Sequence, residues 1–343
     1  MGVRSSRVEV IGCPERLQAI REPWRRLWHA TAAATPFAHP AWLTSASDVF
    51  PADGLLAVAS WRGATLDALA VLGVSAGELH LIGRGVSDYL DALVLPGARR
   101  SFGVELTRAL EGASCWDRAV LTDLPAASIV LSSGAPRGCS DEAAPHAVCP
   151  VLDLADPGAV PARRRRELAY EERRALRRGA ALRVVTEAGD AQRAFDELVR
   201  LHEARWSARG QPGVLADEAV QRFHRAAIAR GLADDGVARL VRLDVRDRCV
   251  GVLYALAAHR RAHYYISGFD PDVRDLGAGV LLIGRAIEDA RAHGAAELDF
   301  LRGAEPYKYT WGARDRPTYR RSLVRAGARG ITRPPSAGAT SRT

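Results

Sequence analysis

Arg274-Asp275-Leu276-Gly277-Ala278-Gly279 lies between a strand-like run, residues 262–269, and a helical run, residues 280–293. A glycine-rich turn between a strand and a helix can direct several backbone N–H groups at one anion, and the helix N-terminus adds a partial positive charge. Glycine lets the backbone approach a ligand closely because it has no Cβ atom. The segment therefore predicts a site for a phosphate or pyrophosphate, with an ordinary strand-to-helix turn as the alternative.

Two familiar phosphate-binding loops do not fit this pattern. No G-K-[ST] follows the glycines, so the segment is not a Walker loop, and its glycine spacing differs from that of the Rossmann fingerprint. The pattern R-x-x-G-x-G instead resembles the acyl-CoA pyrophosphate loop of the GNAT acetyltransferases.

Length and charge set the broad class of the protein. A chain of 343 residues favours two domains. A net charge of +8 favours anionic partners such as CoA phosphates, nucleic acid or membrane headgroups. Lys308 is the only lysine among the 48 basic residues, which indicates a GC-rich coding bias and weakens any argument from the number of arginines.

The five cysteines form no C-x-x-C pair and no zinc-type spacing, so the sequence predicts a reduced protein without a metal site. No run reaches the ~18 apolar residues of a membrane span. The N-terminus has no apolar stretch of the signal-peptide kind. We therefore expect a cytoplasmic protein with no membrane span.

The chain divides into two halves of mixed helix and strand pattern. Residues 1–150 form the first half, which ends in a segment rich in Gly, Pro, Ser and Cys, residues 132–150, that we expect to be a linker. Residues 151–330 begin with a basic helix and then show the order strand, two helices, three strands, glycine loop, helix, strand. The tail, residues 331–343, is rich in Pro, Ser, Gly and Thr and is expected to be disordered.

Further segments, spaced along residues 7–325, share one family pattern. They are Trp24-x-x-Leu27, Pro36-Phe37-x-x-Pro40-x-Trp42, Gly83-x-x-x-Ser87-Asp88-Tyr89-Leu90-Asp91, Leu201-His202-x-x-Arg205-Trp206-x-x-Arg209-Gly210 and Phe300-Leu301-Arg302-Gly303-x-Glu305-x-Tyr307-Lys308-x-x-Trp311-Gly312. Together with the glycine loop they resemble the GNAT-type family once named for cellulose biosynthesis (CelD-like), which is related to the Fem-type peptidoglycan aminoacyltransferases. The resemblance implies an α/β fold with a mixed sheet (α+β), built as two tandem GNAT-like units.

The resemblance also implies where acyl-CoA binds. Arg274, Gly277, Ala278 and Gly279 would hold its pyrophosphate in the second unit. The equivalent turn of the first unit, residues 91–97, lacks the motif, so one CoA site is expected. The first unit would then form the acceptor side, or it would be purely architectural.

Three residues after the last predicted strand are candidates for the chemistry. Glu305 is a candidate general base beside Pro306, or it forms an ion pair with Lys308 or an arginine. Tyr307 would protonate the thiolate leaving group, by resemblance to the GNAT tyrosine after the same strand, or it is a packing residue. Lys308 would bind the CoA 3′-phosphate or an anionic acceptor, or it makes a structural ion pair.

Three other residues are candidates for holding the acceptor. Asp88 could bind its amine, with a turn cap as the alternative. Arg205 could bind a carboxylate or phosphate of the acceptor, or brace a loop. Trp206 could contact the ligand, although a core position is the alternative, and His202 on the same apolar face is expected to be a satisfied core histidine.

The function implied is direct transfer of an acetyl or other acyl group from acyl-CoA, as co-substrate, to an amine or hydroxyl of a small or glycan-linked acceptor. One alternative is a Fem-type enzyme that uses aminoacyl-tRNA, since residues 161–183 contain nine arginines and three glutamates. Tyr170 is the only aromatic residue in that segment, which argues against RNA binding. Another alternative is a non-catalytic relative that acts as a binding protein. DNA is not an expected partner.

Overall fold

The computed structural model describes residues 6–328, which form two compact units. The first contains the described residues up to Ala147 and those from Pro317 onward, and the second contains Val148–Arg316. Two long strands, β7 (Cys139–Asp153) and β13 (Arg314–Arg325), therefore run from one unit into the other. The units differ from the two contiguous ranges expected from the sequence because the chain returns to the first unit in β13.

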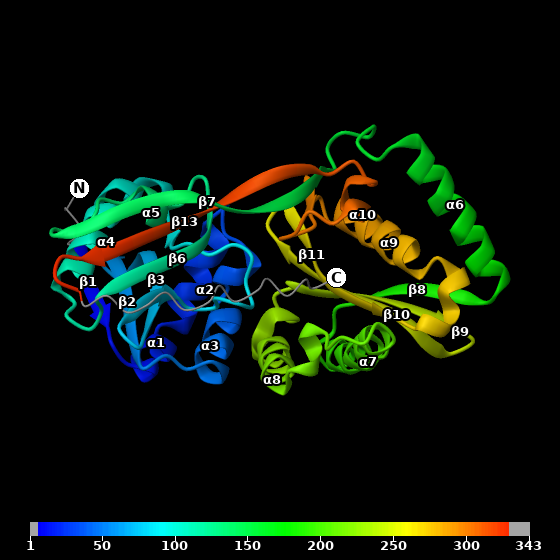
Figure 1. Cartoon of the computed structure of the whole chain (residues 1–343), viewed down its shortest axis with the longest axis horizontal. Helices are drawn as coiled ribbons and strands as arrows, with labels where there is room; N and C mark the ends of the chain where they lie inside the picture. The colour runs from blue at the N-terminus through cyan, green and yellow to red at the C-terminus, as the bar shows by residue number, and fades with distance from the viewer. Residues whose placement is uncertain (1–5, 329–343) are drawn as a thin grey trace. The chain divides into compact units, whose positions relative to one another are not determined.

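The first unit is a sheet with helices on both faces (Figure 1). Its strand order is β1-β2-β3-β4-β6-β13-β7, and β5 pairs with β3. The elements are β1 (Ser6–Ile11), α1 (Pro14–Ala19), α2 (Arg21–Ala30), α3 (Pro40–Val49), β2 (Gly54–Arg62), β3 (Thr65–Ser75), β4 (Glu78–Leu81), β5 (Leu93–Val94), α4 (Arg99–Gly112), β6 (Arg118–Pro125) and α5 (Ile129–Ser132), with 3-10 turns η1 (Pro36–Ala38) and η2 (Pro96–Ala98).

Buried tryptophans explain the motifs of the first unit. Trp24 and Trp42 are 1% and 0% exposed, and each satisfies its indole N–H inside the core. Trp24 Nε1 donates to Ala38 O at 3.1 Å, and Trp42 Nε1 donates to Ser87 Oγ at 3.0 Å. A buried indole needs such a partner, so these motif residues hold the helices and the loop after β4 together.

The second unit has the strand order β7-β12-β11-β10-β9-β8. Its elements are α6 (Ala162–Arg177), β8 (Ala180–Val185), α7 (Ala188–Ser207), α8 (Glu218–Ala227), β9 (Ala238–Val245), β10 (Arg248–Ala258), β11 (Arg261–Phe269), α9 (Ala278–Ala292), β12 (Glu297–Asp299) and α10 (Pro306–Tyr309), with short turns η3 (Val214–Ala216), η4 (Ile228–Leu232) and η5 (Pro271–Leu276). Strand β10 pairs antiparallel with β9 on one side and with β11 on the other.

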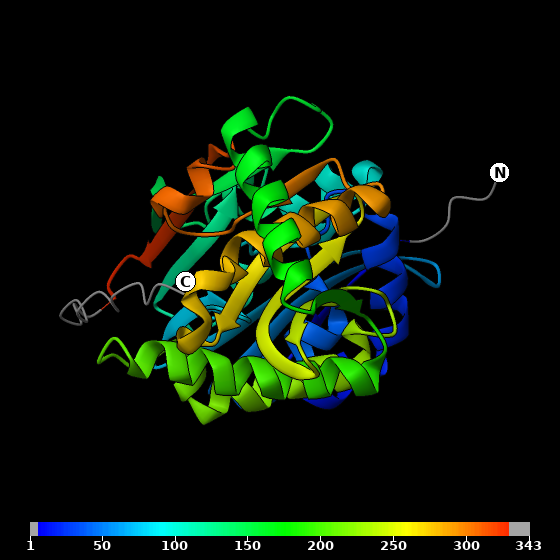
Figure 2. The same cartoon turned by 90° about the vertical axis from the view of Figure 1, so that its right-hand side faces the viewer.

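Helices cover both faces of this second sheet. Helices α7 and α8 lie on one face, and α9 lies on the other with α6 across it (Figures 1 and 2). Two glycines allow close packing between these layers, Gly268 between β11 and α7 and Gly284 between α9 and α6. A Cβ atom at Gly268 would lie 2.7 Å from His202 N of α7, and one at Gly284 would lie 2.4 Å from Leu168 Cδ1 of α6.

The mixed α/β fold predicted from the sequence is confirmed. The predicted linker at residues 132–150 is wrong, because most of it forms the first part of β7. The residues of the predicted disordered tail, 331–343, lie outside the described residues. Among the described residues, no helix is both long enough and apolar enough to cross a lipid bilayer.

Candidate functional site

Strands β11 and β12 diverge in the second unit, and this divergence creates the candidate site. They pair in parallel only from Arg261 with Glu297 to His263 with Asp299. After Asp299 the chain bonds to β7 instead, since the N–H of Phe300 donates to Pro150 O at 2.8 Å. The edge of β11 from residue 264 onward is therefore not paired with β12. We call this place the β11–β12 opening.

A β-bulge shapes the same part of β11. Ala255 pairs with Tyr264 while Tyr254 pairs with Ile266, so Tyr265 is the extra residue on β11. A bulge bends a strand and redirects its side chains, and bulges are common beside active sites. The bulge lies directly after the last pair between β11 and β12.

Three aromatic rings lie together at the β11–β12 opening. The ring centroids of Tyr264, Phe300 and Tyr307 are 5.9 to 6.3 Å apart. The hydroxyls of Tyr264 and Ser267 form a hydrogen bond of 2.5 Å. The hydroxyl of Tyr307 is buried, and no group among the described residues is aligned to form a hydrogen bond with it. Burial raises the pKa of Tyr307, with Tyr264 and Glu305 adding to the effect, so the hydroxyl remains protonated and can donate.

Arg205, near the C-terminal end of α7, adds a positive charge to these rings. Its Cζ lies 4.3 Å from the ring centroid of Phe269. In the described part of the chain its side chain makes no ion pair, and its Nε is buried without a hydrogen-bond partner. Burial lowers the pKa of Arg205, while nearby Tyr264 and Tyr307 raise it; a guanidinium still stays charged. A partly buried arginine without a carboxylate is suited to an anionic ligand group.

Trp206 and His202 pack beside this arginine. Trp206 is 8% exposed, and its ring centroid lies 5.9 Å from that of His202. A Cβ atom at Gly213 would lie 2.2 Å from His202 Cε1 and 2.5 Å from Trp206 Cδ1. This packing favours the core alternative for Trp206. His202 is a core residue as expected, with 0% exposure, but neither ring nitrogen has a hydrogen-bond partner in the described chain.

His202 should make the protein less stable in acid. Burial, followed by the charge of Arg205, lowers the pKa of His202 from its ordinary 6.5 to about 4. In the unfolded chain His202 therefore binds a proton as pH falls below 6.5, whereas in the folded chain it does so only near pH 4. The folded protein thus loses free energy of unfolding as pH falls from 6.5 to 4. A shift of this size corresponds to about 3 kcal/mol.

Urea unfolding at pH 7.5 and pH 4.5 measures this loss. We expect the difference between the two free energies of unfolding to be smaller in His202→Leu by about 2–3 kcal/mol. The same substitution at the exposed His29 is the control. An identical difference in wild type and His202→Leu would contradict the assignment.

The glycine loop enters α9 with a left-handed residue. Gly277 has φ 66° and is the N-cap of this helix, and no side chain caps the first turn. The first N–H groups of a helix have no acceptor within the helix, so they can bind an anion. A Cβ atom at Gly279 would meet only Phe269 Cε1, at 3.9 Å, which leaves space over the loop. Backbone and glycines therefore fit a pyrophosphate, while the side chain of Arg274 lies outside the described part.

Glu171 of α6 faces this loop, which the sequence did not predict. A Cβ atom at Gly277 would lie 2.7 Å from the carboxyl carbon of Glu171. Glu171 Oε2 is buried, and its nearest cation is Arg174 NH2 at 3.4 Å. A carboxylate beside the helix N-terminus competes with an anionic ligand for the same positive potential. An anion at this loop therefore has to displace Glu171 or bind beside it.

Lys308, which is buried, and Glu305, whose side chain is 25% exposed, form an ion pair after β12. Lys308 is 1% exposed, and its Nζ donates to the carbonyl oxygens of Leu301, Arg302 and Gly303, each at 3.0 Å. The Glu305 carboxylate lies 2.9 Å from the same nitrogen. The three donors of the ammonium are thus occupied. This geometry favours the structural ion pair for both residues over phosphate binding by Lys308 or base catalysis by Glu305.

The structure thus places the predicted residues in three groups. Arg205 and Tyr307 lie together at the opening, with Tyr264 and Ser267, which the sequence analysis missed. Gly277, Ala278 and Gly279 form the loop that follows β11. Asp88 belongs to the first unit, in the loop after β4, and is 2% exposed; its role as an acceptor ligand stays a prediction.

Comparison with known proteins agrees with this geometry. Residues 162–309 match the family model described as an acetyltransferase (GNAT) domain. No curated protein matches the sequence. Within residues 6–328, no group of three or more His, Cys, Asp or Glu side chains is arranged to hold a metal ion.

Several solved structures share the fold of nearly the whole chain. FemX aligns with a TM-score of 0.63 at 11% identity, over 91% of this chain and 96% of FemX. The C-terminal domain of a putative lysylphosphatidylglycerol synthetase from Agrobacterium fabrum aligns with a TM-score of 0.61 at 13% identity, over 91% and 93%. L-PGS from Bacillus licheniformis aligns with a TM-score of 0.59 at 12% identity, over 93% of each chain.

The family match, with the fold, indicates an acyltransferase. Residues 162–309, which make up most of the second unit, match the model of a GNAT acetyltransferase domain, and the predicted enzyme class, an acyltransferase, is confirmed. The narrower CelD-like kind stays a prediction.

Proposed function

We propose that this protein transfers an acyl group, acetyl in the simplest case, from acyl-CoA to an amine or hydroxyl of a small or glycan-linked acceptor in the cytoplasm. One observation supports this most strongly. The N-terminus of α9, entered through the left-handed Gly277, follows β11 after the short turn η5, and β11 is the strand whose edge opens away from β12. An anion held at the loop would bring the rest of the donor along that edge.

The residues of the opening suit direct transfer. The acceptor nitrogen or oxygen attacks the thioester carbonyl, the C–S bond breaks, the thiolate takes the proton of Tyr307, and the proton that the acceptor loses restores the Tyr307 hydroxyl. Backbone N–H groups on the free edge of β11 would polarise the carbonyl. Tyr307 would give its proton to the thiolate, since its hydroxyl is buried and protonated. Arg205 would hold an anionic group of the acceptor, and positioning would supply much of the rate.

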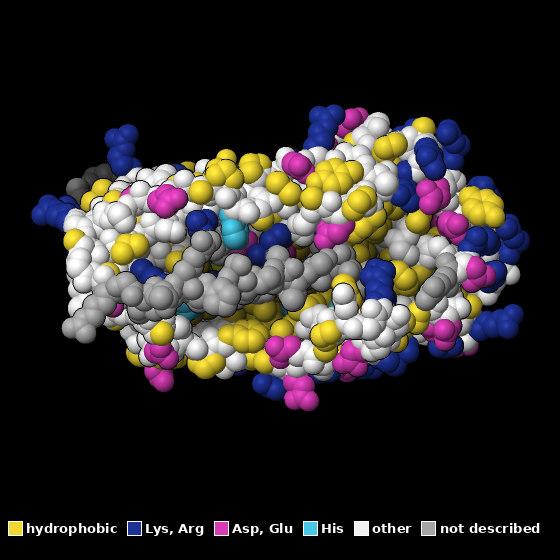
Figure 3. Space-filling view, in the orientation of Figure 1, with side chains coloured by type: hydrophobic (Ala, Val, Ile, Leu, Met, Phe, Trp, Pro, Cys, Tyr) yellow, Lys and Arg dark blue, Asp and Glu magenta, His cyan; other side chains and the backbone are white. Residues whose placement is uncertain are grey.

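Glu171 gives specific support to a second candidate, aminoacyl transfer from a charged tRNA. A carboxylate against the loop opposes a pyrophosphate there. Basic side chains of α6 lie on the surface of the second unit, with acidic ones among them (Figure 3). The fold is shared with FemX and with a putative lysylphosphatidylglycerol synthetase. This candidate predicts tRNA binding that weakens steeply with salt and depends on the arginines of α6.

Glu171→Gln separates the two candidates. If the loop binds acyl-CoA, removal of the carboxylate charge should tighten binding of acetyl-CoA about tenfold, or about 1.4 kcal/mol. Isothermal titration of wild type and variant with acetyl-CoA measures the change. Glu172→Gln is the matched control, because Glu172 is on the same helix and is influenced by Glu288 instead. No acetyl-CoA binding by either protein, with salt-dependent tRNA binding, would favour the second candidate.

A further inference from the structure

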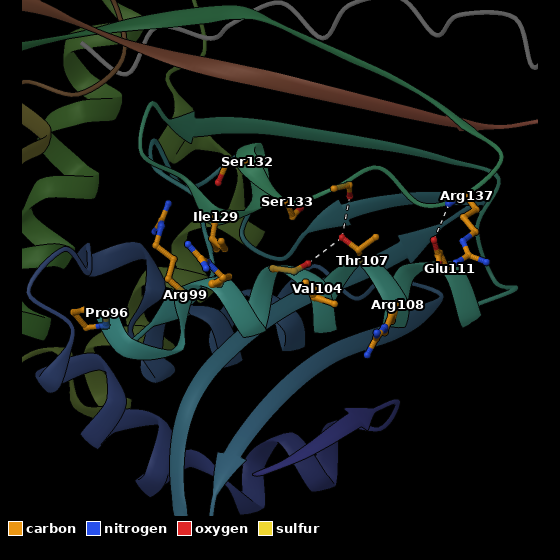
Figure 4. A pocket seen from close by; sticks show the side chains of 13 residues that line it. Pro96, Arg99, Val104, Thr107, Arg108, Glu111, Ile129, Ser132, Ser133 and Arg137 are labelled. Carbon is orange, nitrogen blue, oxygen red and sulfur yellow. Dashed lines mark hydrogen bonds between the residues drawn. The ribbon is translucent and has the colours of Figure 1, made fainter.

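A groove on the first unit lies on the outer side of α4. Helix α4 and the short helix α5 form its walls, and its volume is about 660 Å³ (Figure 4). That volume is within the range of small-molecule sites in proteins. The groove is made wholly of first-unit residues, so its properties are independent of the acyl-transfer site.

The charge along this groove is strongly unbalanced. Arg99, Arg100, Arg108 and Arg137 line it, with Glu111 as the one acidic residue. The side chains of Arg100, Arg108 and Arg137 form no ion pair among the described residues, and Glu111 accepts the backbone N–H of Arg137 at 2.9 Å. The side chain of Arg99 donates to a backbone carbonyl, that of Ala127, and four arginines with one glutamate make the groove a strongly positive surface.

An apolar surface lies between these charges. Val104 is 48% exposed and lies on the same side of α4, and Ile129 of α5 lines the other wall (Figure 4). Arg99 and Arg108 are nine residues apart on one helix, a separation of about 13 Å along its axis. The groove is therefore matched to a ligand in which an uncharged ring lies next to a strongly anionic group.

Buried hydrogen bonds fix the α5 wall. The Asp91 carboxylate accepts bonds from Ser128 Oγ at 2.7 Å and from the N–H groups of Ile129 and Val130 at 3.2 Å. Arg321, 2% exposed, donates to Val130 O at 2.7 Å and pairs with Asp141. A wall held from two sides is preorganised, which lowers the entropy cost of binding.

Helix α4 of the first unit corresponds in topology to helix α9 of the second unit, but its outer side is covered differently. The crossover from β4 to β6 contains β5 and helix α4, and the crossover from β11 to β12 contains helix α9; both strand pairs are parallel. In the second unit α6 packs across α9, with Leu168 against Gly284. The corresponding helix of the first unit has the arginine-lined groove on its outer side instead.

We propose that this groove binds a small molecule of the nucleoside polyphosphate class. Its phosphates would pair with Arg99 and Arg100 at the start of α4 or with Arg108 and Arg137 farther along, and its base would cover Val104. Guanidinium groups bind phosphate oxygens through two parallel hydrogen bonds and also stack on planar rings. Free nucleotides and the 3′-phospho-ADP portion of CoA both belong to this class of ligand.

The test is isothermal titration of the full chain with ATP, ADP, CoA, adenosine and inorganic pyrophosphate. ATP, ADP or CoA should bind more tightly than adenosine or pyrophosphate alone. The double variant Arg100→Ala/Arg108→Ala should weaken that binding at least about tenfold. Val104→Asp should weaken it without removing an arginine. The matched control is Arg193→Ala/Arg222→Ala, which removes two exposed arginines of the second unit.

The variants distinguish ligand binding in the groove from ligand binding at the acyl-transfer site. CoA binding that is lost in Gly279→Val but kept in Arg100→Ala/Arg108→Ala belongs to the acyl-transfer site and gives the groove no support. Equal binding of pyrophosphate and ATP would overturn the nucleoside part of the proposal. No nucleotide binding at millimolar concentration, or RNA binding that the double variant weakens while ATP does not bind, would overturn it entirely.

Discussion

Lys308→Met should lower the free energy of unfolding by about 3–5 kcal/mol, because it leaves a partly buried carboxylate and three carbonyl oxygens without their cation. The ammonium of Lys308 has four oxygen neighbours at 2.9 to 3.0 Å and almost no exposure to water. Methionine fills a similar volume without the charge. Differential scanning calorimetry should show a melting temperature several degrees lower.

A second substitution tests the physical reason. Glu305→Gln in the Lys308→Met background removes the unpaired charge and should restore part of the lost stability. Arg291→Met, at an exposed position of α9, is the control for loss of a single cation. If Lys308 instead binds a phosphate of CoA, Lys308→Met would leave the melting temperature unchanged and weaken acyl-CoA binding.

Tyr307→Phe should reduce kcat about a hundredfold or more, with little change in the KM for acyl-CoA. The substitution keeps the ring among Tyr264 and Phe300 and removes only the buried hydroxyl. That hydroxyl lies near the Tyr264 hydroxyl but makes no well-aligned hydrogen bond among the described residues, so its loss should cost little stability. Release of free CoA thiol during acyl transfer measures the rate.

The matched control for this effect lies two residues away. Tyr309 is on the same short helix, and its hydroxyl donates to Asp315 Oδ1 at 2.7 Å, away from the three rings. Tyr309→Phe should keep its activity. Full activity in Tyr307→Phe would reject the proton-donor role and leave Tyr307 as an aromatic packing residue.

Local pattern was enough to predict much of the second unit. The order of strands and helices around Gly277 is found as expected. Hydrophobic periodicity and the glycines at turns depend on a few neighbouring residues, so they can be recognised in the sequence. The basic helix expected at the start of the second half is α6, Ala162–Arg177. The second of the three expected strands is β10, which is buried along most of its length.

Long-range contacts account for what the sequence did not predict. β7 is polar and exposed over much of its length, so its composition is that of a linker, and its pairing depends on strands far along the chain. Glu171 meets Gly277 only because α6 folds back across α9, with more than a hundred residues between them. Tyr264 and Ser267 lie in a strand that looks apolar, and the polar pair within it was a signal that could have identified them.

The central claim is that the loop before α9 binds the pyrophosphate of acyl-CoA, and Gly279→Val tests it most directly. Gly279 has room for a Cβ atom, so the fold should tolerate the change, whereas the left-handed Gly277 with Glu171 against it should not. Glu288→Val, exposed on the same helix, is the control. The account predicts, by isothermal titration, acetyl-CoA binding in wild type and Glu288→Val and its loss in a folded Gly279→Val. Equal affinity in all three proteins would contradict it.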